Sequence, residues 1–177
     1  MAFAELSIAA ERPPALSSID RAALFLDLDG TLAPIAARPQ DVRPDPRRTS
    51  LLERLDRALD GRIAVVSGRT LADIDRILEG RVKAVAAVHG LAHRDTEGRI
   101  RQAAPHPNLS QAIEALSVFA EQDVGLLVEN KGVSVTLHYR LAPAFAEASG
   151  VLAKRIAEET GLYLQPGDMV MELRTPG

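Results

Sequence analysis

The hydrophobic positions in the first half of the chain predict alternating strands and helices. Three short and mainly apolar runs, at residues 24–28, 63–66 and 84–88, are typical of strands buried in a parallel sheet. Between them, apolar residues recur at helical spacing in the ranges 51–59 and 71–78. The order strand, helix, strand, helix, strand predicts parallel βαβ units with right-handed crossovers.

The second half of the chain predicts a smaller layer of helices and antiparallel strands. One helix is expected after Asn108, which begins an Asn-x-x-Gln capping-box pattern, and another from Pro143 to about Thr160. Two strands are expected to follow at residues 161–165 and 169–173, on either side of a Pro-Gly turn. With the hairpin described next, each helix precedes two strands, which is an α+β arrangement.

Alternating apolar and polar residues between these two helices predict a β-hairpin. Its strands are expected at residues 124–128 and 133–139, with a turn at residues 130–132. The residues of the first strand expected to face inward are Val124, Leu126 and Val128. The second strand should bury its odd-numbered residues and place on its opposite face Ser134, Thr136, His138 and Arg140.

These patterns predict an α/β core with a smaller domain inserted in it. Residues 1–20 are expected to form a loose leader, because paired prolines and serines interrupt any periodicity. Residues 21–104 would form the N-terminal part of the core, and residues 105–174 the inserted α+β domain. Residues 175–177 would begin the return to the core.

Composition and charge narrow the classes of protein. The 177 residues are 46% hydrophobic with a formal net charge of -3, so we expect a buried core and neither nucleic acid nor membrane as a partner. The absence of cysteine excludes disulfides, thiolate metal sites and cysteine nucleophiles. The N-terminal residues lack the pattern of a signal peptide, so a cytoplasmic protein is expected.

Two carboxylates stand at the end of the first predicted strand. Asp27 and Asp29 are two residues apart, so in extended chain both side chains point toward one ligand. Like charges at such a site need a cation or a shared proton between them, which suits Mg²⁺ and phosphoryl chemistry. The alternative is that this Asp-x-Asp-Gly segment is only a turn with a local side-chain cap.

The second predicted strand ends in a candidate phosphate seat. Ser67 offers a hydroxyl, Gly68 a backbone that a ligand can approach closely, and Arg69 leads into the start of a helix. Parallel strands would bring this segment beside Asp27 and Asp29. Taken alone, the segment would be an ordinary N-terminal turn of a helix.

The predicted hairpin and the last strand carry polar residues that suit a sugar. Glu129 and Lys131 have the same strand parity at the hairpin tip, so they can present an acceptor and a donor to hydroxyl groups. Glu172 alternates with Met171 and Leu173 and should point out of the same sheet. The alternative is a solvated face with surface ion pairs.

The segment Asp27-Leu28-Asp29-Gly30-Thr31-Leu32 resembles the first motif of the haloacid dehalogenase superfamily, and Ser67 matches its second motif. Further segments, taken in order, resemble the trehalose-phosphate phosphatases over about residues 22–177. The segments that carry this resemblance are Val65-Val66-Ser67-Gly68-Arg69, His89-Gly90, Glu129-Asn130-Lys131-Gly132, His138-Tyr139-Arg140 and Glu172-Leu173-Arg174.

The resemblance implies a Rossmann-like haloacid dehalogenase core with an inserted α+β cap domain. The implied activity is Mg²⁺-dependent hydrolysis of trehalose 6-phosphate to trehalose and phosphate. Asp27 would be the nucleophile that forms an aspartyl-phosphate, and Asp29 the general acid and base. The Asp27 carboxylate and the Asp29 backbone carbonyl would contact Mg²⁺. An association with a trehalose-phosphate synthase is also suggested.

The resemblance assigns the other site residues to two groups. The residues implied to bind phosphate are Thr31, Ser67, Gly68 and Arg69. The residues implied to bind the sugar are His89, Gly90, Glu129, Lys131, Arg140 and Glu172. Two alternatives remain open: a related phosphatase acting on sucrose phosphate or a mannosyl phosphate, and a non-catalytic domain that binds a sugar phosphate.

In the family, a lysine and an acidic pair that complete the site would follow Gly177. We therefore expect these residues to be the N-terminal part of a longer polypeptide, or to be completed by a second chain, and to be inactive alone. Without the later strands, residues 24–28 would form an exposed apolar edge.

Overall fold

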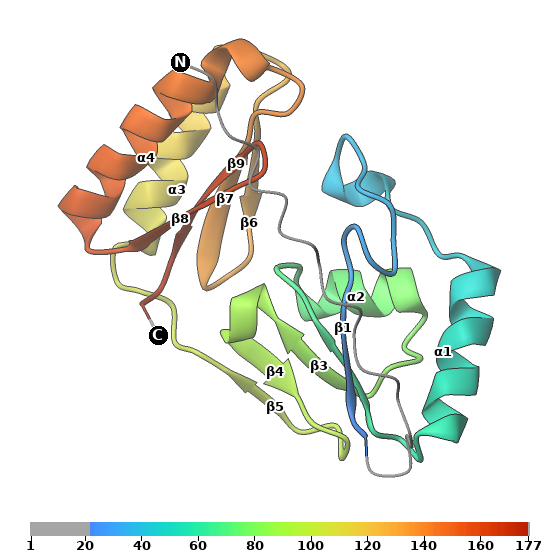
Figure 1. Ribbon diagram of the computed structural model, residues 1–177. Coiled ribbons are helices and arrows are strands. Elements are labelled where there is room, and N and C mark those ends of the chain that lie inside the picture. The colour runs from blue at the N-terminus through green and yellow to red at the C-terminus, as the bar shows by residue number, and fades with distance from the viewer. Residues whose placement is uncertain (1–21, 177) are drawn as a thin grey trace, which may run out of the picture.

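The computed structural model describes residues 22–176 and arranges them in two lobes that lie side by side (Figure 1). The first lobe holds a five-stranded sheet and the second a four-stranded sheet, each with two α-helices. The expected leader, residues 1–20, and the terminal Gly177 lie outside the described residues. The two apolar cores are separate clusters, one in each lobe.

The sheet of the first lobe begins with three parallel strands, as predicted. These are β1 (Leu24–Asp27), β2 (Ile63–Val66) and β3 (Ala84–Ala87), adjacent in that order. An antiparallel hairpin of β4 (Ala92–Arg94) and β5 (Ile100–Gln102) extends the sheet from β3. This hairpin was not predicted, because each strand has three residues and too few apolar positions to show a period.

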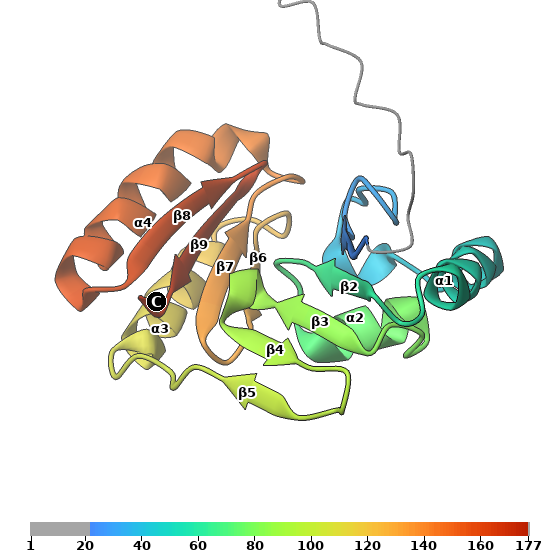
Figure 2. The same ribbon diagram turned by 60° about the horizontal axis from the view of Figure 1, so that its bottom comes forward.

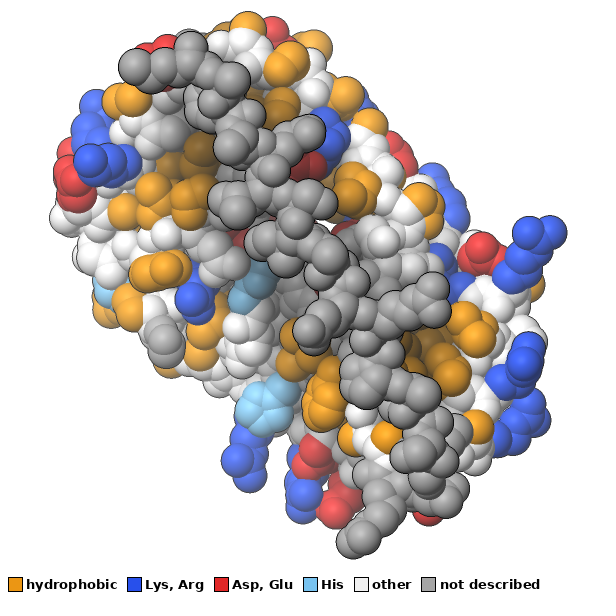
Figure 3. Space-filling model, in the orientation of Figure 1, with side chains coloured by type: hydrophobic (Ala, Val, Ile, Leu, Met, Phe, Trp, Pro, Cys, Tyr) orange, Lys and Arg blue, Asp and Glu red, His pale blue; other side chains and the backbone are white. Residues whose placement is uncertain are grey.

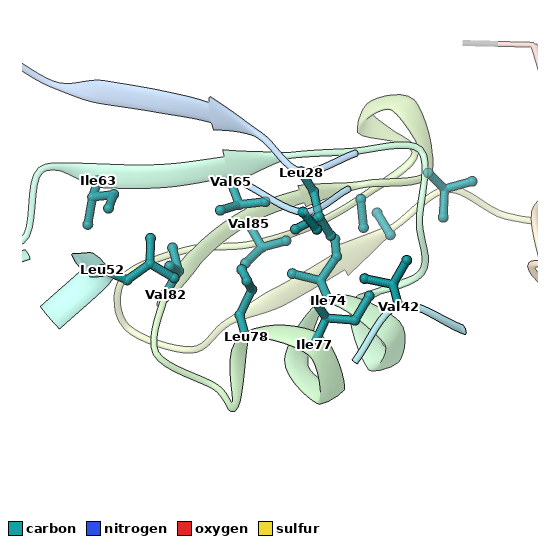
Figure 4. Close-up of a cluster of buried hydrophobic side chains, with 14 of the residues drawn as sticks. Leu28, Val42, Leu52, Ile63, Val65, Ile74, Ile77, Leu78, Val82 and Val85 are labelled. Atoms are coloured by element: carbon teal, nitrogen blue, oxygen red, sulfur yellow. The ribbon is translucent and has the colours of Figure 1, made fainter. Parts of the chain in front are cut away.

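Two helices cover one face of this sheet (Figure 2). The helix α1 (Pro46–Ala58) begins after Asp45, whose carboxylate accepts a hydrogen bond from the backbone N–H of Arg47. The helix α2 (Leu71–Leu78) begins after Thr70, whose hydroxyl accepts from the N–H of Asp73, as the sequence predicts. Figure 4 shows the side chains buried between helices and sheet, among them Leu28, Leu52, Val65, Ile74 and Ile77.

The opposite face of the first sheet is open in the described part of the chain. The strand β1 lies at the edge of the sheet, and the side chain of Phe25 is 70% exposed. Val66, on the neighbouring strand, is also exposed. Among the apolar residues of the edge expected at residues 24–28, only Phe25 is exposed, because Leu28 is buried in the core and Leu26 packs against it. On the face drawn in Figure 3, basic and acidic side chains are interspersed.

The second lobe is an antiparallel sheet with helices on one face. Its helices are α3 (Leu109–Ala120) and α4 (Ala146–Thr160), the latter preceded by the short 3₁₀ turn η3 (Pro143–Phe145). Its strands, in the spatial order β6-β7-β9-β8, are β6 (Leu127–Asn130), β7 (Ser134–His138), β9 (Val170–Arg174) and β8 (Tyr163–Gly167). The helices pack against the apolar face, so the polar face turns toward the first lobe.

Three local predictions in this lobe are wrong. Val124 is 99% exposed, because the chain turns at Asp123, whose carboxylate accepts from the N–H of Gly125, and β6 begins only at Leu127. The Asn108 side chain makes no capping bond; its amide donates to the carbonyl of Thr160 instead. The strand β8 continues through the Pro-Gly pair, so the turn lies at residues 168–169.

Candidate active site

A cavity of about 330 Å³ lies between the two lobes. All of the predicted site residues line it except Thr31 and Gly90. The first lobe contributes the carboxyl ends of β1 and β2, where ligands bind in open α/β sheets. The second lobe contributes the polar face of its sheet. The titratable residues that line the cavity are Asp27, Asp29, Arg69, His89, Glu129, Lys131, His138, Arg140, Asp168 and Glu172.

The two carboxylates at the end of β1 differ in their surroundings. The Asp27 carboxylate is exposed to the cavity and has no hydrogen-bond or ion-pair partner among residues 22–176. Both oxygens of Asp29 accept hydrogen bonds from the Arg69 guanidinium, each at 2.8 Å. Because the Asp29 side chain reaches Arg69 rather than the backbone of its own turn, a local side-chain cap does not explain its position.

Arg69 is a buried residue that holds Asp29 in place. Its side chain forms the fork to Asp29 and donates a third hydrogen bond to the Pro39 carbonyl at 2.8 Å. Burial alone would lower the pKa of Arg69, but the hydrogen bond and charge of Asp29 outweigh this, so the pKa is raised and the guanidinium stays cationic. The Arg69 side chain is thus engaged with Asp29 and Pro39, and its role in phosphate binding stays a prediction.

Ser67 and the turn after β2 form a seat suited to an anion. The Ser67 hydroxyl oxygen accepts from the backbone N–H of Arg69 at 3.2 Å, which leaves its own proton free to be donated. The helix α2 begins four residues later, so its positive end lies on the same side of the sheet. A hydroxyl donor and a helix N-terminus together favour a bound phosphate.

His89 lies directly over the backbone of Gly68. A Cβ atom at Gly68 would approach the His89 Nε2 atom to 2.6 Å, so a larger residue here would displace the imidazole. His89 has a left-handed φ of 53°, as does its neighbour Val88 with 48°, and such conformations in residues other than glycine occur often at functional sites. The turn therefore orients the imidazole toward the cavity at the expense of local strain.

Contacts of Glu172 and Lys131 join the two lobes. Glu172 is 4% exposed; its carboxylate accepts from Ser134 Oγ at 2.6 Å and from His89 Nε2 at 3.1 Å. Lys131 Nζ lies 3.6 Å from the same carboxylate and donates to the Gly68 carbonyl at 2.9 Å. Hydrogen bonds therefore cross between the lobes, from His89 to Glu172 and from Lys131 to the Gly68 carbonyl. The hairpin tip lies against the turn after β2.

These contacts determine the ionisation of Glu172. Burial alone would raise its pKa, but the hydrogen bonds from His89 and Ser134 and the charge of Lys131 outweigh it, so the pKa is lowered. The carboxylate is therefore the stable form at neutral pH, ready to accept hydrogen bonds.

The lowered pKa of Glu172 predicts acid sensitivity. The folded state binds this proton less readily than the unfolded chain, so its contribution to stability is present above about pH 4.5 and is lost as the pH falls through the lowered value. Urea unfolding across this pH range should show that the free energy of unfolding falls less on acidification in Glu172→Gln than in the unaltered chain. Glu159→Gln, on the exposed side of α4, serves as the control. An unchanged pH slope in Glu172→Gln would contradict the prediction.

Two further pairs line the cavity on the side of the second lobe. His138 Nε2 and Glu129 Oε2 are 2.9 Å apart, and Arg140 donates to the Asp168 carboxylate at 2.7 Å. Sequence reasoning placed His138 on the polar face of its strand without assigning it a role. Asp168 gave no signal, because an aspartate in a turn is common and its pairing with Arg140 is not visible in the sequence.

The described residues contain no cluster of three or more His, Cys, Asp or Glu side chains that could hold a metal ion. The donors near Asp27 are nevertheless those that Mg²⁺ prefers, since a free carboxylate and a backbone carbonyl are hard oxygen ligands. Mg²⁺ is commonly held by one or two carboxylates together with substrate phosphate. The uncommitted Asp27 carboxylate fits this chemistry. No helix in the described part is long and apolar enough to cross a bilayer.

Comparison with solved structures supports the same arrangement of lobes. A trehalose-6-phosphate phosphatase related protein is similar with a TM-score of 0.76 and 27% identity, over 88% of this chain and 69% of that one. The C-terminal domain of trehalose-6-phosphate phosphatase from C. albicans is similar in fold, with a TM-score of 0.77 and 22% identity, over 88% of this chain and 57% of that one.

Sequence comparison agrees. A probable trehalose-phosphate phosphatase of Sinorhizobium fredii is 34% identical over 165 residues, covering 89% of this chain and 60% of the relative. Trehalose-6-phosphate phosphatase of Escherichia coli is 34% identical over 157 residues, covering 88% of this chain and 59% of the relative. The chain thus spans about 60% of the length of these relatives. The family model for trehalose-phosphatase matches residues 25–177, and the chain therefore belongs to the trehalose-phosphatase family.

Proposed function

We propose that the protein hydrolyses trehalose 6-phosphate to trehalose and phosphate. One observation carries the proposal: a single cavity places the free carboxylate of Asp27 opposite the polar face of the second sheet. The first side has the groups for phosphoryl transfer, and the second has acceptors and donors for sugar hydroxyls. In this proposal residues 21–104 form the catalytic core and residues 105–174 act as its cap.

The chemistry proceeds in two steps. An Asp27 carboxylate oxygen attacks phosphorus and the bond from phosphorus to the sugar oxygen breaks, while Asp29, which enters this step protonated, gives that proton to the leaving oxygen. The Asp29 carboxylate then takes a proton from water, which attacks the aspartyl-phosphate and releases phosphate and free Asp27. The fork from Arg69 keeps Asp29 oriented in both steps. The Ser67 hydroxyl donates a hydrogen bond to a phosphate oxygen.

Mg²⁺ would be held by the Asp27 carboxylate and the Asp29 backbone carbonyl, and when bound it neutralises charge on the phosphoryl group. On the sugar side, Glu129 and Glu172 accept hydrogen bonds from hydroxyls and Lys131 donates one. Closure of the cap around the substrate excludes water from the reacting phosphorus. Thr31 and Gly90 lie outside the cavity lining, and their roles in binding phosphate and sugar stay predictions. A cytoplasmic location and an association with a synthase stay predictions.

Phosphate release from trehalose 6-phosphate tests the proposal. It is measured with these 177 residues and with any further residues of the natural polypeptide, in Mg²⁺ and after its removal with EDTA. We expect turnover that needs Mg²⁺ and that is faster for trehalose 6-phosphate than for sucrose phosphate or a mannosyl phosphate. Preference for another sugar phosphate would favour a related phosphatase. Binding of trehalose 6-phosphate without any turnover would favour a non-catalytic binding domain.

A further inference from the structure

One row of polar residues crosses the whole sheet of the second lobe. Glu129 on β6 pairs with Thr136 on β7, Thr136 pairs with Glu172 on β9, and Glu172 pairs with Gln165 on β8. Residues in register share one face of a sheet. Because the opposite face packs on α3 and α4, the row faces the first lobe, and Glu129, Thr136 and Glu172 line the cavity.

In this row, the hydroxyl of Thr136 has no hydrogen-bond partner. Thr136 is 1% exposed, and its Oγ1 atom is buried with no hydrogen bond to any residue of the described range. The neighbouring carboxylates are committed elsewhere: Glu129 to His138, and Glu172 to Ser134 and His89. An unsatisfied buried hydroxyl is destabilising, so its retention on a cavity wall calls for an explanation.

We infer that the Thr136 hydroxyl contacts a hydroxyl of the sugar and helps to set sugar specificity; the inference rests on the proposed function. A sugar hydroxyl both donates and accepts, as Thr136 Oγ1 does, so the two groups satisfy each other. Adjacent strands are about 4.8 Å apart, so the row offers successive polar groups along an extended ligand. Glu129 and Glu172 flank Thr136 in this row, so contact of a sugar hydroxyl with Oγ1 requires one of these carboxylates to leave its present partners.

Two substitutions of Thr136 separate a sugar contact from a structural role. Thr136→Val keeps the shape and removes the hydroxyl, whereas Thr136→Ser keeps the hydroxyl. Binding of trehalose 6-phosphate and of inorganic phosphate is measured by calorimetry, and Tm by thermal unfolding. Thr136→Val should bind trehalose 6-phosphate about five- to tenfold more weakly, and phosphate unchanged, while Thr136→Ser stays within about twofold of the unaltered chain.

The Tm gives a second readout, because loss of a hydroxyl with a structural role would lower the Tm. Removing an unpaired hydroxyl should leave the Tm of Thr136→Val unchanged or raise it by about 2–4 °C. The matched control is Thr160→Val in the same lobe. Thr160 is also buried, but its hydroxyl donates to the Ile156 carbonyl at 2.6 Å. This control should lower the Tm and leave binding of trehalose 6-phosphate unchanged.

The outcomes distinguish this inference from the proposed function. Unchanged binding of trehalose 6-phosphate by Thr136→Val would overturn the role of Thr136 and leave the proposed function standing. Equal weakening of trehalose 6-phosphate and phosphate, or a Tm loss like that of Thr160→Val, would overturn it as well. If the unaltered chain binds phosphate but not trehalose 6-phosphate, the proposed function fails and this inference fails with it.

Discussion

Asp27→Asn should abolish phosphate release from trehalose 6-phosphate, with a loss on the order of 10⁴-fold or more in kcat. An asparagine side chain keeps the size of aspartate but offers no anionic oxygen to attack phosphorus. The exposed carboxylate of Asp27 has no partner in the described chain, so its replacement leaves the fold unchanged. Steady-state phosphate release in Mg²⁺, together with thermal unfolding, measures both effects.

The control for this substitution is Asp60→Asn, which makes the same replacement at an exposed carboxylate outside the cavity. It should leave turnover and Tm unaltered. Calorimetry should show that Asp27→Asn still binds trehalose 6-phosphate, because the sugar contacts lie on the second lobe. Substantial residual turnover in Asp27→Asn, with the protein folded, would rule out Asp27 as the nucleophile.

Arg69→Ala should reduce hydrolysis of trehalose 6-phosphate by about 10²-fold. The reason is that the Arg69 fork orients Asp29, and a general acid that is free to rotate loses its position beside the leaving oxygen. Arg69 is 8% exposed, so its removal also unpairs a carboxylate and should lower the free energy of unfolding by about 2–3 kcal/mol. Urea unfolding measures this loss.

Arg69→Lys sharpens the test, because an ammonium group cannot form the two parallel hydrogen bonds of a guanidinium. The lysine should stay cationic, yet Arg69→Lys should recover only part of the activity that Arg69→Ala loses. Arg99→Ala is the control, since Arg99 forms ion pairs with Asp95 and Glu97 on the surface of the first lobe, where such pairs contribute little. Equal turnover by Arg69→Ala and the unaltered protein would show that Asp29 needs no external orientation.

The accuracy of the sequence prediction follows the strength of each local signal. The strands β1, β2 and β3 were predicted because a buried parallel strand needs an unbroken apolar run. The hairpin β4–β5 was missed because its strands are short and rather polar, and are stabilised by pairing with β3. Val124 was misplaced because its alternation with Leu126 continued beyond the point where the strand begins.

The sequence by itself determined which polar residues stand at strand ends and which share a face of a strand. Strand parity places Asp27 and Asp29 at the end of β1, Ser67 at the end of β2, and Glu129 and Glu172 on one face of the second sheet. Parity and strand order follow from local periodicity, which the sequence contains. The structure accordingly brings these residues together around one cavity.

Only the tertiary structure decided how these groups are partnered. Arg69 pairs with Asp29 forty positions earlier, and His89 meets Glu172 across the two lobes. The unpaired hydroxyl of Thr136 is likewise invisible in the sequence, where a threonine on a polar strand face is unremarkable. Such contacts depend on the approach of elements that are distant along the chain, and no local pattern of residues encodes that approach.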